Sequence, residues 1–145
     1  MENFNNFKIN LLEARDCGVG HVFLEEHNAK KNDVEKQIND FLQRHNLKPL
    51  TDWIHINETK GKEMLLGFLE KDLAYHSRLM SFEQAQGFTN QFFEFFDLNS
   101  LQVFTNAEID GTSVSWSGVT QATFDQIIVC IDNRYIGFVC FEDED

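Results

Sequence analysis

The chain has 145 residues, 42% of them hydrophobic and 25% charged, and these two fractions are typical of a soluble globular protein. Its fifteen phenylalanines are unusual, and they indicate a packed core or an adhesive surface. This length predicts a single domain with a sizeable core, while the net charge of −12 disfavours direct binding to nucleic acid or to anionic membranes. The first residues show no basic segment followed by an apolar one, and no apolar run is long enough to span a bilayer, so we expect no signal peptide, no membrane contact and a cytoplasmic location.

The first fifty residues predict two short strands and one helix. Residues 8–14 (KINLLEA) and 20–26 (GHVFLEE) have the composition of strands. Asn32 followed by Glu35 has the spacing of a capping box, which predicts the start of a helix. The apolar face of that helix has spacings of three and four and consists of Val34, Ile38, Phe41, Leu42 and His45.

A strand and two further helices are expected next. Residues 50–57 (LTDWIHIN) alternate imperfectly and predict a strand, with Trp53 in the core. Residues 62–80 carry a helical apolar stripe, in which Gly67 costs about 1 kcal/mol relative to alanine and therefore indicates close packing. Ser81 and Gln84 form a second capping box. We expect the helix that follows to pair with the preceding one across a short turn.

The remainder of the chain is rich in strand formers. Segments LQVFTNAEI, TSVSWSGV, DQIIVCID and YIGFVCFED are separated by glycine, asparagine and aspartate, which favour turns. The run IIVCI, residues 127–131, is apolar at every position and predicts a central strand covered on both faces. The fold class expected for residues 1–145 is therefore α+β, a single domain in which a mostly antiparallel sheet is packed by about three helices.

The cysteines do not suggest a disulfide framework. If Asn133 and Arg134 form a two-residue hairpin loop, Cys130 pairs with Gly137, and Cys140 pairs with a residue on the opposite strand, Ile127. The two sulfurs then lie on opposite faces of the sheet. A three-residue loop restores a common face but leaves the sulfurs several residues apart, so we expect both thiols to be buried and unpaired.

No motif predicts catalysis or a cofactor. Cys17 and His21 have the residue types of a nucleophile and its base, but nothing in the sequence fixes their geometry. The histidines are scattered singly, and the chain has no C-x-x-C or H-x-x-x-H pairing. The sequence GVG at 18–20 lacks the rest of a phosphate-binding loop. We therefore expect a protein that is not an enzyme and that binds no metal and no cofactor.

The acidic residues are distributed unevenly along the chain. Residues 1–50 contain eight acids and seven bases, whereas residues 51–145 contain sixteen acids and five bases. Several acids at strand ends and turns would gather at one rim of a sheet, which makes a basic protein partner as good an explanation of the acidity as solubility alone. The candidate partner-binding residues are these acids and two aromatic neighbours: Glu108, Asp110, Trp116, Asp125, Asp132, Tyr135, Glu142, Asp143, Glu144 and Asp145.

Three segments carry a resemblance to a known family. They are DLAY at Asp72–Tyr75, Trp116 together with TFD at Thr123–Asp125, and FEDED at Phe141–Asp145. Over roughly residues 63–145 the chain resembles the small cytosolic immunity proteins of bacterial contact-dependent growth inhibition and related polymorphic toxin systems. The resemblance implies stoichiometric binding to the C-terminal domain of a cognate toxin, often a basic nuclease acting on RNA or DNA, with its active site or substrate path blocked.

Two alternatives stay open at the level of sequence. The first is an adaptor or self-associating module that uses the phenylalanine-rich helix 81–97 as its contact surface. The second is an enzyme with a cleft that no motif announces. Of these readings the sequence favours the toxin-binding protein, acting as a monomer.

Overall fold

The computed structural model describes residues 2–27, 33–110, 113–122 and 124–143, with the side chains of 108–116 excepted. These residues form four helices, α1 (Glu2–Ala14), α2 (Val34–Arg44), α3 (Glu58–Glu70) and α4 (Phe82–Phe93). An antiparallel sheet has the order β1-β7-β6-β3-β2, and its strands are β1 (Val19–Glu26), β2 (Ile54–Ile56), β3 (Gln102–Thr105), β6 (Phe124–Ile131) and β7 (Tyr135–Asp143). A separate hairpin joins β4 (Ala107–Asp110) to β5 (Ser113–Trp116). The predicted α+β class is confirmed, with one more helix than expected.

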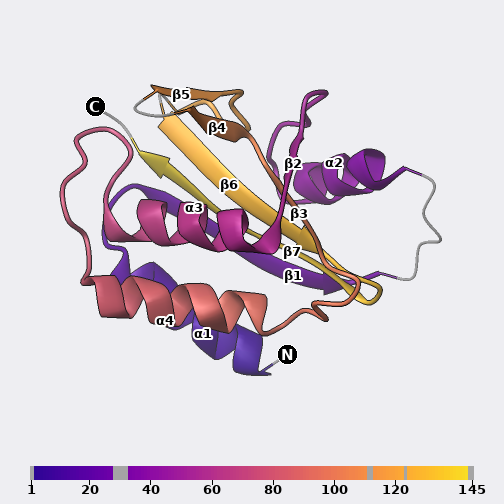
Figure 1. The fold of residues 1–145 in the computed structure, drawn as a ribbon, viewed down its shortest axis with the longest axis horizontal. Helices are drawn as coiled ribbons and strands as arrows, with labels where there is room; N and C mark the ends of the chain where they lie inside the picture. The colour runs from indigo at the N-terminus through magenta and orange to yellow at the C-terminus, as the bar shows by residue number, and fades with distance from the viewer. Residues whose placement is uncertain (1, 28–32, 111–112, 123, 144–145) are drawn as a thin grey trace.

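The sheet separates two hydrophobic cores. Helices α1, α3 and α4 cover one face, and α2 with the segment that follows it covers the other (Figure 1). Neighbouring residues of β6 alternate between them: Ile128 and Cys130 enter the first core, whereas Ile127 and Val129 enter the second. The prediction that 127–131 is a central strand covered on both faces is therefore confirmed. None of the helices in the described ranges is long and apolar enough to cross a membrane.

Of the two loop lengths considered for the last hairpin, the two-residue loop is the one observed. Cys130 lies opposite Gly137 and Cys140 lies opposite Ile127, as a two-residue loop requires. The two cysteines belong to opposite cores and both are free thiols. Burial raises the pKa of each thiol well above its ordinary value, so both remain protonated and act as small apolar side chains.

The segment 8–14, predicted as a strand, is part of helix α1. Phe4, Phe7 and Leu11 are the buried residues of this helix, at spacings of three and four. A window that begins at residue 8 contains only one of them, so the helical period is hidden. The prediction was wrong because the local apolar run was considered without the two phenylalanines before it.

Two boundaries in the next segment differ from expectation. The N-cap of α2 is Asp33, whose carboxylate accepts a hydrogen bond from the N–H of Lys36 at 3.0 Å, so the cap lies one residue beyond Asn32. The predicted strand 50–57 shrinks to β2 because Asn39 holds the chain before it: its side chain bonds to both backbone groups of Leu50 and accepts the indole N–H of Trp53. Trp53 is buried, as expected.

Helices α3 and α4 pack together, but no short turn joins them. Helix α3 ends at Glu70, and the connection 71–81 is a folded loop in which Lys71 forms a β-bridge with Arg78. The capping box of Ser81 and Gln84 is confirmed at the start of α4.

The close packing expected at Gly67 is absent, because among the described residues, apart from its chain neighbours and the nearby backbone of its own helix, no atom lies within 4 Å of where its Cβ would stand. The tight contact is at Gly61 instead, where a Cβ would lie 2.8 Å from Val103 Cγ1.

Candidate partner-binding site

The acidic residues predicted to share one rim are divided between the two ends of the β6–β7 hairpin. Asp125 and Glu142 lie opposite each other at the open end, with Asp143 beside them. Asp132 and Tyr135 lie at the turn, and the length of β6 places roughly 20 Å of strand between the two groups. The prediction of a single acidic rim therefore does not hold for these residues.

Asp125 is buried and organises the segment before β6. Its carboxylate accepts hydrogen bonds from the backbone N–H groups of Val119 and Thr120, from the Thr120 hydroxyl, and from the Asn106 side-chain amide at 2.9 Å. The Asn106 amide oxygen in turn accepts the N–H of Ile127, which fixes the bend between β3 and β4. The oxygens of Asp125 are therefore committed to the fold.

Asp132 has the same role at the closed end. Its carboxylate accepts the backbone N–H groups of Asp97, Arg134 and Tyr135 at 2.6–2.8 Å. Tyr135 is half-buried against the first core, and the Arg134 guanidinium lies over its ring at 4.9 Å. A partner could reach the ring only in part, and it could not bond to the Asp132 carboxylate without competing with the turn.

Asp143 forms a buried ion pair with Arg15. The two side chains are bidentate, at 2.8 and 3.1 Å, and are almost fully excluded from solvent. The guanidinium also donates to the carbonyl of Phe68, and the carboxylate accepts the N–H of Leu73. This pair ties the end of β7 to α1, α3 and loop 71–81, so the charge of Asp143 is neutralised inside the molecule.

Glu142 and the Cys17–His21 pair lie nearby. His21 Nε2 bonds to a carboxylate oxygen of Glu142, with both side chains about a fifth exposed. Burial and then the Asp143 carboxylate raise the pKa of the Cys17 thiol above its ordinary value, which disfavours the thiolate that a nucleophile needs. His21 is therefore engaged by a carboxylate, and Cys17 is poorly activated.

For the remaining predicted residues the structure describes the backbone alone or nothing. The backbones of Glu108, Asp110 and Trp116 lie in the β4–β5 hairpin, opposite Ser115, Ser113 and Ala107 respectively, but their side chains are not described. Glu144 and Asp145 fall beyond the last described residue.

The phenylalanine-rich face of α4 is already occupied within the chain. Phe92 is fully buried and its ring stacks on Phe7 of α1 at 6.1 Å. Phe93 and Phe96 are also buried, and Phe88 is half-buried against Phe7. The surface on which a self-associating module would depend is therefore used to attach α1 and α4 to the sheet.

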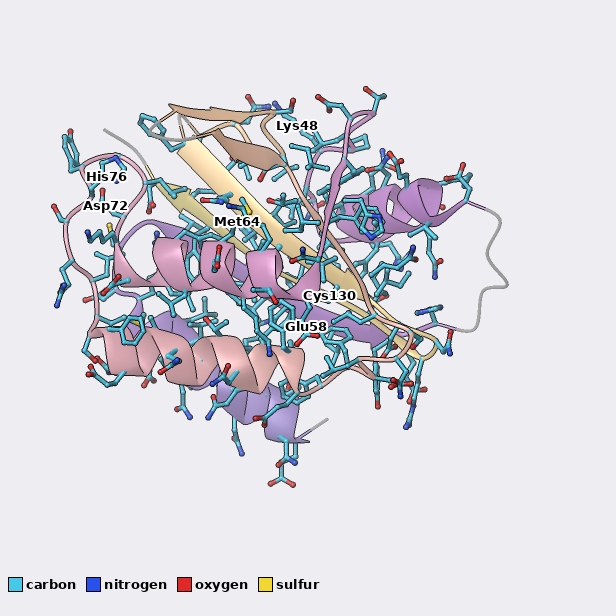
Figure 2. The ribbon with its side chains drawn as sticks, in the orientation of Figure 1. Lys48, Glu58, Met64, Asp72, His76 and Cys130 are labelled. Atoms are coloured by element: carbon cyan, nitrogen blue, oxygen red, sulfur yellow. The ribbon has the colours of Figure 1, made fainter. Side chains whose placement is uncertain are left out.

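A surface cavity of about 340 Å³ lies between α3 and the end of the β6–β7 hairpin at which its two strands are not joined. We call it the α3 cavity. Helix α3 and loop 71–81 form one side, and the starts of β4 and β6 form the other. Figure 2 shows Met64 on the side of α3 facing β6, with Asp72 and His76 in the loop beyond. Its described lining residues are Glu63, Met64, Gly67, Phe68, Lys71, Asp72, Leu73, Ala74, His76, Ala107, Phe124, Asp125 and Gln126.

The loop wall of the α3 cavity is held by Asp72. This carboxylate is buried and accepts the backbone N–H groups of Tyr75 and Ser77. Burial alone would raise the pKa of Asp72, but the N–H groups of the loop outweigh it and hold the pKa below its ordinary value. His76 sits in the same loop with φ of 58°, a left-handed conformation that these hydrogen bonds maintain.

The sequence analysis did not predict the α3 cavity, although it singled out several of the residues that line it. Asp125 was a candidate site residue, and Gly67 was noticed as an unusual glycine in a helix. A glycine within a helix is compatible with close packing or with open space beside it, and the sequence analysis took Gly67 to indicate close packing, whereas the structure shows open space. In the described part of the chain, no three histidine, cysteine or acidic side chains are grouped so as to hold a metal ion.

Comparison with known proteins found no matching family model, no similar curated protein and no similar solved structure.

Proposed function

We propose that this chain is a non-enzymatic binding protein of the immunity type, which neutralises a basic toxin domain by stoichiometric binding in the cytoplasm. The toxin would be a nuclease, and binding would cover its active site or the path of its substrate. The interface would be near the standard size of about 1,600 Å². Neither a metal nor a cofactor takes part in this mechanism.

The observation that carries the proposal is that the segments resembling immunity proteins lie together at the α3 cavity. Loop residues Asp72 and Leu73, from the DLAY segment, and Asp125, from the TFD segment, both line it. Asp143, from the FEDED segment, accepts the N–H of Leu73 and so holds the loop in place. Segments far apart in the chain thus build one recess at the surface, which is where an interface concentrates its binding energy.

The charge of the molecule supports a cationic partner. A nuclease binds its substrate through lysine and arginine, and this chain carries a net charge of −12. Complementary charge speeds the encounter and disfavours the wrong partners. The proposal relies mainly on the exposed carboxylates acting together, because the buried carboxylates of Asp125, Asp132 and Asp143 are committed to the fold.

The test is a growth assay with the protein encoded immediately upstream. Its C-terminal domain is expressed in a susceptible host, alone and together with this chain. We expect growth arrest in the first case, recovery in the second, and a one-to-one complex by isothermal titration calorimetry. An unrelated acidic protein of similar size and net charge is the control, and it should not protect.

Continued arrest with both proteins present at equal levels would reject the proposal. Equal protection by the unrelated acidic protein would also reject it, because charge alone would then account for the effect.

A further inference from the structure

We infer that the α3 cavity receives an arginine side chain from the cationic partner. This inference rests on the proposed function, because that function supplies the partner polypeptide. It goes further by assigning one site on the surface and one residue type to fill it.

The walls of the α3 cavity suit a long side chain with an apolar stem. Met64 and Phe68 contribute apolar surface from α3, Leu73 contributes it from the loop, and Phe124 contributes it from β6. Beside them, Gly67 leaves open space, because apart from its chain neighbours and the nearby backbone of its own helix the described residues place no atom within 4 Å of its Cβ position. A methylene stem would gain from removal of this surface from water.

The same walls carry excess negative charge. Glu63, Asp72 and Asp125 line the cavity against one cationic residue, Lys71. Asp72 and Asp125 are 5% and 3% exposed, and salt screens buried charges much less than exposed ones. Backbone N–H groups and Arg15 already offset part of this charge. A cationic head group would offset more of it, whereas a neutral apolar group would not.

Asp72 retains capacity to bind such a head group. One of its oxygens accepts the N–H of Ser77 and the other accepts that of Tyr75. The backbone N–H of Ala74 also acts on this carboxylate. Since a carboxylate offers about four acceptor positions, about one remains for a guanidinium. Asp125 contributes charge alone, because its oxygens already accept from several groups of the fold.

Arginine fits these features better than lysine. Its guanidinium is planar and weakly hydrated, and it presents several N–H donors in a fixed geometry that matches a carboxylate such as that of Asp72. Arginine is also enriched among the residues that dominate binding energy at interfaces. Because Gly67, Lys71 and His76 are exposed, the rim is open to a side chain presented by another protein surface.

The experiment titrates this protein with N-acetyl-arginine amide and follows backbone amide shifts by nuclear magnetic resonance. N-acetyl-citrulline amide, which has the same shape but no charge, is the matched probe. We expect saturable shifts at residues 63–76 with the arginine probe, and affinity weaker by about tenfold for citrulline, as the loss of one charge-assisted contact predicts.

A variant pair locates the binding. Gly67→Leu fills the open space beside the cavity and should lower the affinity for the arginine probe by about tenfold or more. Gly87→Leu is the control, since Gly87 lies on α4 and the described residues likewise place no atom near its Cβ position. The affinity of the Gly87→Leu variant for the arginine probe should equal that of the wild type.

Equal affinity for both probes, or unchanged binding by Gly67→Leu, would overturn the inference. The probe comparison needs no variant and remains decisive if Gly67→Leu does not fold. Failure of the proposed function is seen separately in the growth assay: absent protection there rejects the immunity role, whereas protection combined with equal probe affinities rejects only the arginine site.

Discussion

Asp72, Asp125, Asp132 and Asp143 are buried, and the carboxylate of each accepts backbone N–H groups. A buried carboxylate is costly to desolvate unless it is paired or hydrogen-bonded. Here the bonds fix the connection after α3, the segment before β6, the β6–β7 turn and the end of β7. Single aspartates thus stabilise the connections between elements. Their negative charges are part of the net charge of the molecule, but their hydrogen bonds serve the fold.

The pH dependence of Asp72 tests this role. Its pKa is lowered from an ordinary value of 3.8 in the folded protein, so its ionisation stabilises the fold at pH values above the unfolded pKa. That contribution is lost as the pH falls through the folded pKa. We expect Asp72→Asn to unfold at lower urea concentration than the wild type at pH 7.

The difference in free energy of unfolding between Asp72→Asn and the wild type should then decrease steadily below about pH 4. Urea unfolding monitored by circular dichroism at several pH values measures it. A difference that stays constant down to pH 2, or that increases, would contradict the assignment.

At the scale of elements, α3 has two glycines in opposite surroundings. Gly61 is buried against β3, where a Cβ would press on Val103. Gly67 faces open space at the cavity. The first glycine allows helix and sheet to approach closely, whereas the second costs helix stability without a packing contact in return.

Alanine substitutions should separate these two situations. Gly67→Ala should raise the free energy of unfolding by about 1 kcal/mol, and Gly87→Ala on α4 should do the same, because both remove only the helix penalty. Gly61→Ala should lower it by about 1–3 kcal/mol through overpacking. Urea denaturation of the three variants gives the values, and a destabilised Gly67→Ala would show that the space beside it is needed by the fold.

The elements that sequence predicted correctly depend on local signals. The capping box at Ser81 and the two-residue loop of the last hairpin, one of the two loop lengths considered, are contained within a few residues each. Helix α1 was missed because its period needs Phe4 and Phe7.

The α3 cavity was missed for a different reason. Its walls come from α3, loop 71–81, β4 and β6, and only tertiary packing brings these together. Sequence also could not separate buried aspartates from exposed ones, because the N–H groups that the buried carboxylates accept come in part from segments distant in the chain, as Leu73 does for Asp143 and Asp97 for Asp132.

For the whole molecule, exposed negative charge is spread over the helical surface. Within the described ranges, the exposed carboxylates are Glu2, Glu13, Asp16, Glu26, Asp33, Glu35, Asp40, Asp52, Glu63, Glu83, Glu94 and Asp97. Each of the four helices carries at least one of them, and others lie in strand β1 and in the connecting segments, so the negative field is broad. A site that selects the proposed partner would have to be narrower, and Glu63 is the member of this set that lines the α3 cavity.

Two single substitutions distinguish broad attraction from local steering of the cationic partner. Glu63→Gln removes a charge at the cavity, and Glu35→Gln removes one on α2, on the opposite face of the sheet. Charges separated by more than about 10 Å are largely screened at 0.1 M salt, so Glu63→Gln should slow association about two- to threefold while Glu35→Gln changes it little.

Stopped-flow association rates at 0.1 M and 1 M salt measure this difference, which should vanish at the higher concentration because the screening length falls to about 3 Å. Equal slowing by both variants at 0.1 M salt would mean that the partner responds to total charge, and the cavity would then have no special part in the encounter.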